Sequence, residues 1–154
     1  MEKLNQFHVS YVLAKKDNGV IFGDKIVEIS DNNTTIDGIR KQLAKDMKET
    51  SPDIAWDEAT ILNFRPMKEF FEKSAYLHIS YLCFSPGLND PTFGDAIIHL
   101  AGDDVCLDNI HGWLIHMLSE YKPDVKWNKP IIIDLQPLPE DLALQLDPNL
   151  KNQE

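Results

Sequence analysis

Two long segments of this 154-residue chain repeat one another. Phe7–Met67 aligns with Leu77–Leu138 at an offset of 70 residues, which becomes 71 from Phe22 onward. Outside the connecting loop, the 54 aligned columns contain 16 identities. Unrelated segments of this length would share about 3 identities. The sequence therefore predicts a tandem duplication of one small unit.

Each copy is predicted to fold as strand, strand, helix, strand. Apolar and polar residues alternate in the first strand, which is typical of a sheet with one buried face. The dipeptide Asn18-Gly19 favours a tight turn into the second strand. The predicted strands are Phe7–Ala14, Val20–Ile29 and Ile61–Phe64 in the first copy, with Ile131–Leu135 as the last strand of the second.

One helix is predicted in each copy. It should begin after Asn33-Thr34-Thr35 in the first copy and after Asp103-Asp104 in the second, because these residue types cap helix N-termini. Apolar residues then recur at helical spacing and form one stripe. The stripe consists of Ile36, Ile39, Leu43 and Met47 in the first copy and of Leu107, Ile110, Leu114 and Leu118 in the second.

The fold class that follows is α+β, with mostly antiparallel sheet and one helix per repeat. A hairpin followed by a crossover helix usually places the third strand beside the first. Three strands and one helix form a marginal core, so we expect the copies to pair their edges or stack their open faces. The expected divisions are a first ββαβ repeat over 1–73, a second over 74–142 and a polar C-terminal tail over 143–154, which we expect to be frayed from Asp147 onward.

The net charge of −10 is concentrated in the second copy. Residues 1–73 hold 11 basic and 13 acidic residues (−2), whereas residues 74–154 hold 4 and 12 (−8). Such a charge disfavours direct nucleic-acid binding and favours a basic protein partner, or a surface that imitates DNA. No apolar run approaches the roughly 20 residues of a membrane-spanning helix. Cys83 and Cys106 occupy non-equivalent positions in the copies, so we expect free thiols and a cytoplasmic protein.

The main candidate for catalysis is a set of three polar residues that occurs twice: His8, Ser10 and Asp24, then His78, Ser80 and Asp95. A His and a Ser two residues apart share one face of a strand, so each set contains a base, a nucleophile and an orienting carboxylate. A serine in mid-strand lacks the sharp turn that holds known serine nucleophiles. Retention of the set in both copies also fits a structural role, and the sequence favours a protein that is not an enzyme.

Signatures of cofactors and metals are absent from the sequence, which has no dinucleotide fingerprint, Walker loop or Cys-x-x-Cys pair. His111 and His116 are about 140° apart around the predicted helix, so they cannot ligate one ion together. We therefore expect no cofactor and no metal. Trp56 and Trp127 close a repeated Pro-Asp segment, where we expect them to seal the core rather than stack on a ligand.

The two predicted helices differ outside the shared stripe. Positions that are mostly polar in the first helix hold Trp113, Ile115 and Met117 in the second. The second helix therefore either packs on two sides or presents an exposed apolar patch. Because Trp and Met are enriched at interfaces, the predicted partner-binding residues are Trp113 and Met117, with an acidic rim of Asp103, Asp104 and Asp108.

The first copy opens with Val9-Ser10-Tyr11, carries Phe22-Gly23-Asp24 in its second strand and closes with Ile-Leu-Asn-Phe-Arg-Pro at 61–66. In these motifs it resembles short uncharacterised proteins of bacterial prophages. The resemblance covers each copy singly, and this chain departs from it by being doubled. It implies a mobile-element setting, in which small acidic proteins often inhibit host or competitor machinery, and it carries no established function.

The leading hypothesis is a non-catalytic acidic protein-binding module, which would act as an inhibitor, immunity or anti-defence factor and could imitate DNA. It would be a monomer or a homodimer. One alternative is a small hydrolase that uses the His, Ser and Asp sets. The other is a binder of small ligands, such as nucleotides, in the groove between the repeats. Steep salt sensitivity of partner capture would favour the inhibitor, and loss of activity in Ser80→Ala would favour the hydrolase.

Overall fold

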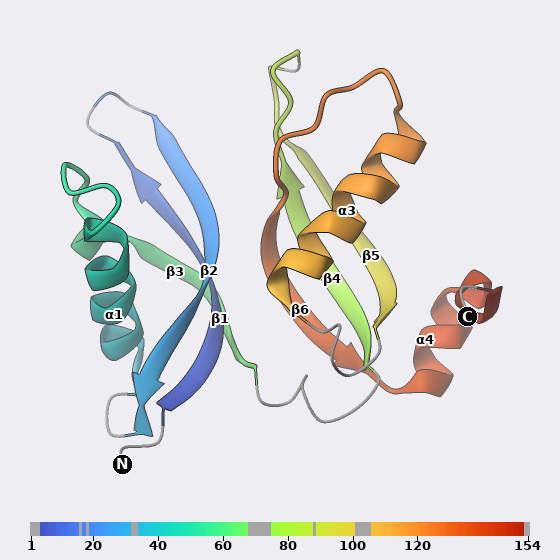
Figure 1. Ribbon diagram of the computed structural model, residues 1–154, viewed down its shortest axis with the longest axis horizontal. Coiled ribbons are helices and arrows are strands. Elements are labelled where there is room, and N and C mark those ends of the chain that lie inside the picture. Colours follow the sequence, from blue (N-terminus) through green and yellow to red (C-terminus); the bar gives the residue numbers. More distant parts are fainter. Residues whose placement is uncertain are drawn as a thin grey trace. The chain divides into compact units, whose positions relative to one another are not determined.

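The computed structural model shows an α+β chain that divides into two compact units, Met1–Lys68 and Glu69–Glu154. It describes residues 4–15, 17, 19–31, 34–67, 75–87, 89–100 and 106–152. Each unit contains one three-stranded antiparallel sheet (Figure 1).

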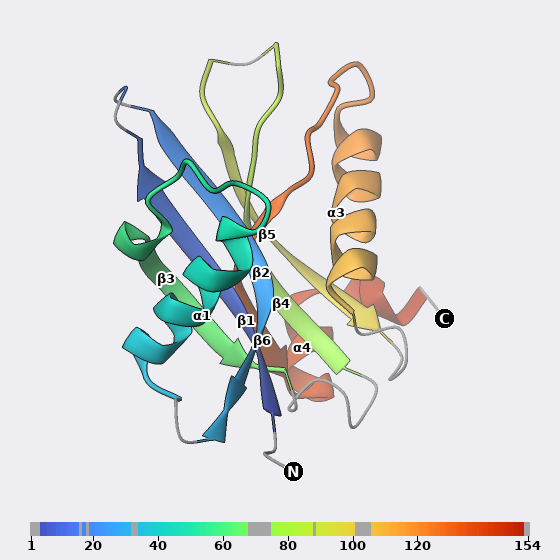
Figure 2. The same cartoon turned by 60° about the vertical axis from the view of Figure 1, so that its left-hand side comes forward.

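The first unit is a sheet with one helix packed on it. The elements are β1 (Leu4–Ala14), β2 (Val20–Ser30), α1 (Ile36–Lys48), a short 3-10 helix η2 (Trp56–Glu58) and β3 (Thr60–Pro66). The strand order is β2-β1-β3, so the third strand lies beside the first as predicted. Figure 2 shows α1 lying across one face of this sheet.

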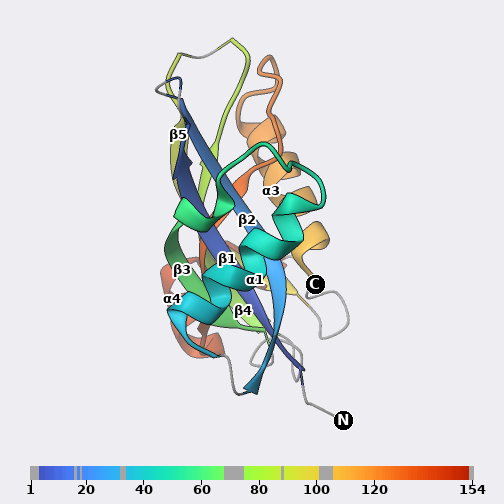
Figure 3. The same cartoon turned by 90° about the vertical axis from the view of Figure 1, so that its left-hand side faces the viewer.

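The second unit has the same strand order and one additional layer. Its elements are β4 (Ala75–Cys83), β5 (Thr92–Leu100), α3 (Leu107–Tyr121), β6 (Ile131–Leu138), α4 (Glu140–Leu146) and a 3-10 helix η4 (Pro148–Asn152). The strands are ordered β5-β4-β6, which is again the predicted order. Figures 1 and 3 show α3 and α4 on opposite sides of this sheet.

Helix α1 begins and packs much as its sequence predicts. Thr35 is the N-cap, and its hydroxyl accepts a hydrogen bond from the amide of Gly38 at 3.0 Å. Ile39 and Leu43 are fully buried, but Ile36 is 52% exposed because it lies in the first turn of the helix, at the end of the stripe. Trp56 is buried, and its ring packs edge-on against Tyr11, which confirms its predicted place in the core.

Helix α3 keeps the predicted buried stripe but not the predicted cap. Ile110, Leu114 and Leu118 are buried. The N-cap residue is Cys106, whose side chain makes no capping hydrogen bond. The prediction that Asp103-Asp104 would cap the helix is therefore wrong, since the helix starts at Leu107 and its N-cap position is Cys106. Asp103 and Asp104 themselves lie outside the described residues.

The expected polar tail is corrected by the structure, which shows α4 through Leu146 and, where fraying was expected, η4 over Pro148–Asn152. Ala143 is fully buried and Leu150 is 2% exposed. Polar residues predominate in this part of the chain, but the segment Leu-Ala-Leu-Gln-Leu at 142–146 is amphipathic once it is helical. Burial of its apolar side stabilises a helix that its composition alone would leave marginal.

A tyrosine packed over a glycine lies at the centre of each sheet. Tyr11 is paired with Gly23 across β1 and β2, and Tyr81 with Gly94 across β4 and β5. A Cβ atom added to Gly23 would lie 2.3 Å from the hydroxyl oxygen of Tyr11, and one on Gly94 would lie 2.4 Å from that of Tyr81. In both sheets the register to the third strand shifts immediately before the tyrosine. The repeated Ser-Tyr and Phe-Gly-Asp motifs therefore encode this packing.

We predict that Gly94→Ala destabilises the second unit by about 1–3 kcal/mol, because the new methyl group overlaps the Tyr81 ring. Gly112→Ala is the matched control. A Cβ at Gly112 meets nothing within 4 Å, and alanine is favoured over glycine in a helix by up to about 1 kcal/mol. Chemical unfolding monitored with amide exchange in β4 and β5 measures both variants. Equal stabilities of Gly94→Ala and Gly112→Ala would contradict the packing argument.

Candidate functional site

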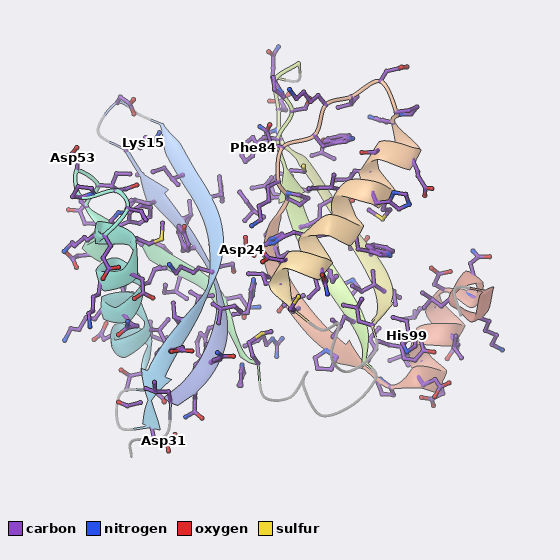
Figure 4. The ribbon with its side chains drawn as sticks, viewed as in Figure 1. Lys15, Asp24, Asp31, Asp53, Phe84 and His99 are labelled. Atoms are coloured by element: carbon purple, nitrogen blue, oxygen red, sulfur yellow. The ribbon has the colours of Figure 1, made fainter. Side chains whose placement is uncertain are left out.

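The repeated polar residues lie on the sheet face opposite the helix-packed core. Phe7, Val9 and Tyr11 belong to the core that contains the buried residues of α1. His8 and Ser10 alternate with them along β1, so they occupy the other face. Ser10 is paired with Asp24 of β2, which places all three candidate residues on that face. Figure 4 shows Asp24 on the side of β2 away from α1.

In the first unit, His8 and Asp24 form a buried pair. Nε2 of His8 lies 3.0 Å from Oδ2 of Asp24, and the two side chains are 0% and 5% exposed. The buried Nδ1 of His8 has no hydrogen-bond partner among the described residues. The hydroxyl of Ser10 donates to the backbone oxygen of Asn63 at 3.5 Å. A catalytic triad needs one ring nitrogen on the carboxylate and the other on the serine, and this geometry does not provide the second contact.

In the second unit, the equivalent pair is open to solvent. Nε2 of His78 lies 3.2 Å from Oδ2 of Asp95, with side-chain exposures of 31% and 75%. Ser80 is half-buried and is paired with Asp95 across the sheet. A cavity of about 420 Å³ borders this pair. It is lined by His78, Asp95, Ala96, Ile97, Leu146 and Asp147.

The structure thus brings together the His and Asp of each predicted set. Sequence reasoning missed the contribution of α4, whose last residue Leu146 and the following Asp147 line the cavity beside Asp95. The amphipathic pattern at 142–146 could have revealed the helix. The sheet face on which it packs could not have been read from that pattern.

The carboxylates of this face also act on the tyrosines of the core. Burial raises the pKa of Tyr11 above its ordinary value of 10.0, and the nearby negative charge of Asp24 raises it further. Burial likewise raises the pKa of Tyr81, with smaller contributions from Cys83 and Asp95. Both effects disfavour the tyrosinate anion in the folded protein.

The described residues contain no group of three or more His, Cys, Asp and Glu side chains that could hold a metal ion. His111 is buried, whereas His116 is exposed and faces Glu120 at 3.4 Å. Both thiols are free. The buried Cys83 donates a hydrogen bond to the backbone oxygen of Asn128 at 3.2 Å, and burial raises the pKa of its thiol, so the thiolate needed for metal binding or nucleophilic attack is disfavoured.

The predicted partner-binding residues of α3 are only partly accessible. Trp113 and Met117 are both half-buried. The Asp108 side chain is 93% exposed and lies 3.9 Å from the ammonium group of Lys129. Asp103 and Asp104, the remainder of the predicted acidic rim, lie outside the described residues. Half-burial leaves Trp113 able either to pack within the chain or to contact a partner.

Comparison with protein families, with curated proteins and with solved structures found no match to this chain. Over the part of the chain that the structure describes, no helix combines the length and apolar character of a membrane span.

The two His–Asp pairs should differ in their contribution to stability. We predict that Asp24→Asn costs about 2–3 kcal/mol, because it weakens a buried hydrogen bond to a charged group. Asp95→Asn should cost less than about 1 kcal/mol, because its partner contact is exposed to solvent. Hydrogen exchange on the full chain measures the free energy of opening at the amides of β1–β2 and of β4–β5, and these values are compared between each variant and the wild type. A similar loss of stability in both variants would show that burial does not distinguish the two His–Asp pairs.

A second prediction concerns alkaline pH. Because the folded state raises the pKa of Tyr11 and Tyr81, it binds more protons than the unfolded state above about pH 10, and stability should fall as the pH rises further. Replacing both residues by Phe keeps the rings over the glycines and removes the two phenols. Urea midpoints at pH 9, 10 and 11 should then decline less steeply than in the wild type. Parallel declines would contradict the raised pKa values.

Proposed function

We propose that this chain is a non-catalytic acidic protein-binding module with a basic partner, and that the second unit makes the principal contact. The observation that carries the proposal is the coincidence, in that unit, of exposed apolar side chains with a large excess of negative charge. Apolar anchors supply affinity when they are desolvated, and surrounding charge supplies orientation and a fast association rate. The inhibitor, immunity or anti-defence role belongs to the same proposal and rests on the prophage resemblance.

The negative charge is weakly compensated within the second unit. Residues 74–154 hold 12 acidic and only 4 basic side chains. Of the latter, Lys129 is near Asp108, and the Lys122 ammonium group lies 5.8 Å from the centre of the Tyr121 ring. The 4 lysines of this part of the sequence therefore cannot neutralise its 12 carboxylates. A basic partner would relieve this repulsion.

Exposed apolar groups accompany this charge. Phe93 of β5 is 65% exposed, Leu146 at the end of α4 is 59% exposed and Tyr121 at the end of α3 is 78% exposed. Phe93 is paired with Leu82 across the sheet and is two residues before Asp95 on β5. It therefore lies on the same sheet face as Asp95. Aromatic residues are enriched at the centres of protein interfaces. This face is therefore a second candidate contact surface, in addition to Trp113 and Met117 on α3.

The repeated His, Ser and Asp residues support a structural rather than a catalytic use. In the first unit, Ser10 is bonded to backbone and Nδ1 of His8 has no partner among the described residues. In the second unit, the exposure of His78 and Asp95 beside a cavity keeps hydrolysis as the alternative function. A duplication would explain why both units carry the same strand order and the same register shift.

The proposal predicts salt-sensitive capture of a basic protein by the immobilised full chain from a lysate of its native host. Capture should be strong at about 0.05 M salt and weak at about 0.5 M, where the screening length falls to a few Å. Truncating an anchor should cost about 2 kcal/mol or more, which is roughly 30-fold in affinity. We therefore expect Phe93→Ala or Trp113→Ala to lose the partner, while Val20→Ala, an exposed apolar position in the first unit, retains it.

Melting temperatures of the same variants show whether a loss of capture reflects unfolding. Retained capture in both anchor variants, or capture that is insensitive to salt, would contradict the proposal. Ester hydrolysis that disappears in Ser80→Ala would instead establish the hydrolase alternative.

A further inference from the structure

The cavity beside the exposed His–Asp pair has walls of two kinds. Asp95 and Asp147 supply carboxylates from β5 and from the residue after α4. Ile97 and Leu146 supply aliphatic surface. Asp95, Ile97 and His99 alternate along the sheet face opposite α3. Figure 4 shows His99 beside α4, so this helix packs on the same face and closes one side of the cavity.

Both carboxylates keep the capacity to accept further hydrogen bonds. Oδ2 of Asp95 is engaged by His78 at 3.2 Å, and Oδ1 of Asp147 accepts from the amide of Asn149 at 3.0 Å. A carboxylate offers about four acceptor positions, so each retains most of its acceptor sites. Among the described residues, His78 is the ion-pair partner of Asp95, and Asp147 has none.

These walls select one kind of occupant. Two carboxylates repel an anion, and the described residues provide no three-ligand set for a metal ion. An arginine side chain fits both walls: its methylene stem packs on aliphatic surface, and its planar guanidinium has five donors that can engage carboxylates in pairs. Lysine would place a single compact charge there and leave more of the acceptors unused.

We propose that this cavity binds an arginine side chain of the basic protein partner, an assignment that rests on the proposed function and locates its contact. The charge of −8 over residues 74–154 attracts such a partner, and Phe93 lies on the same face two residues before Asp95. The first unit lacks the site. Its Asp24 is 5% exposed, and none of its described elements corresponds to α4.

The test is a titration of the ¹⁵N-labelled full chain with N-acetyl-arginine amide, followed by NMR. The neutral isostere N-acetyl-citrulline amide and the lysine analogue are titrated in parallel. We expect saturable shifts confined to the amides around His78, Asp95–Ile97 and Leu146–Asp147, with a Kd in the millimolar range for one side chain. Citrulline should bind at least about tenfold more weakly, since it lacks the charge that strengthens hydrogen bonds to carboxylates.

Variants separate the cavity from the general acidic field. Asp95→Asn and Asp147→Asn should each weaken arginine binding about fivefold or more, which is about 1 kcal/mol. An asparagine at position 147 retains a side-chain oxygen for the amide of Asn149, so the end of α4 is preserved. Asp108→Asn removes the same charge from α3 and should leave binding unchanged. Equal binding of arginine and citrulline, or equal weakening by Asp108→Asn, overturns the proposal.

The outcome is distinguishable from a failure of the proposed function. A flat arginine titration with retained capture of a basic partner overturns the arginine site and leaves the protein-binding module intact. If arginine binds but no partner is captured, the proposed protein-binding function is wrong. The assignment of this cavity to a partner's arginine is then wrong as well.

Discussion

The close packing of a tyrosine ring on a glycine is the constraint on which each sheet depends. The hydroxyl oxygen of Tyr11 occupies the space that a side chain at position 23 would need, and Tyr81 does the same at position 94. The register shift beside each tyrosine turns the strand locally. The residue after each glycine is an aspartate, which by strand alternation lies on the other face, beside the histidine.

The same arrangement has different surroundings in the two units. His8 and Asp24 are buried, whereas the corresponding pair in the second unit is exposed and borders a cavity. Helix α4 follows the repeated part of the sequence, and its end contributes a carboxylate and an apolar side chain to that cavity. This additional segment thus gives the second unit a surface that the described part of the first unit lacks.

The proposed protein-binding function rests on charge and on the exposure of apolar side chains. A nucleophile requires a base within hydrogen-bonding distance, and the ring nitrogens of His8 do not provide this for Ser10. Recognition requires accessible apolar groups within a complementary field. The second unit offers Phe93 and Leu146 as such groups, and the excess of carboxylates in its sequence supplies the field.

The sequence alone determined the six strands, their order in each sheet, helices α1 and α3 and much of the core, because alternation, helical spacing and turn residues are local signals. It did not reveal α4. It indicated the buried stripe Ile110–Leu118 and the core position of Trp56. Tertiary structure decided the rest. Whether a His–Asp pair is buried or exposed, and which sheet face receives α4, depends on contacts between segments distant in the chain, which no local pattern records. For that reason the cavity at Asp95 is a product of the fold, although the residues that line it were all visible in the sequence.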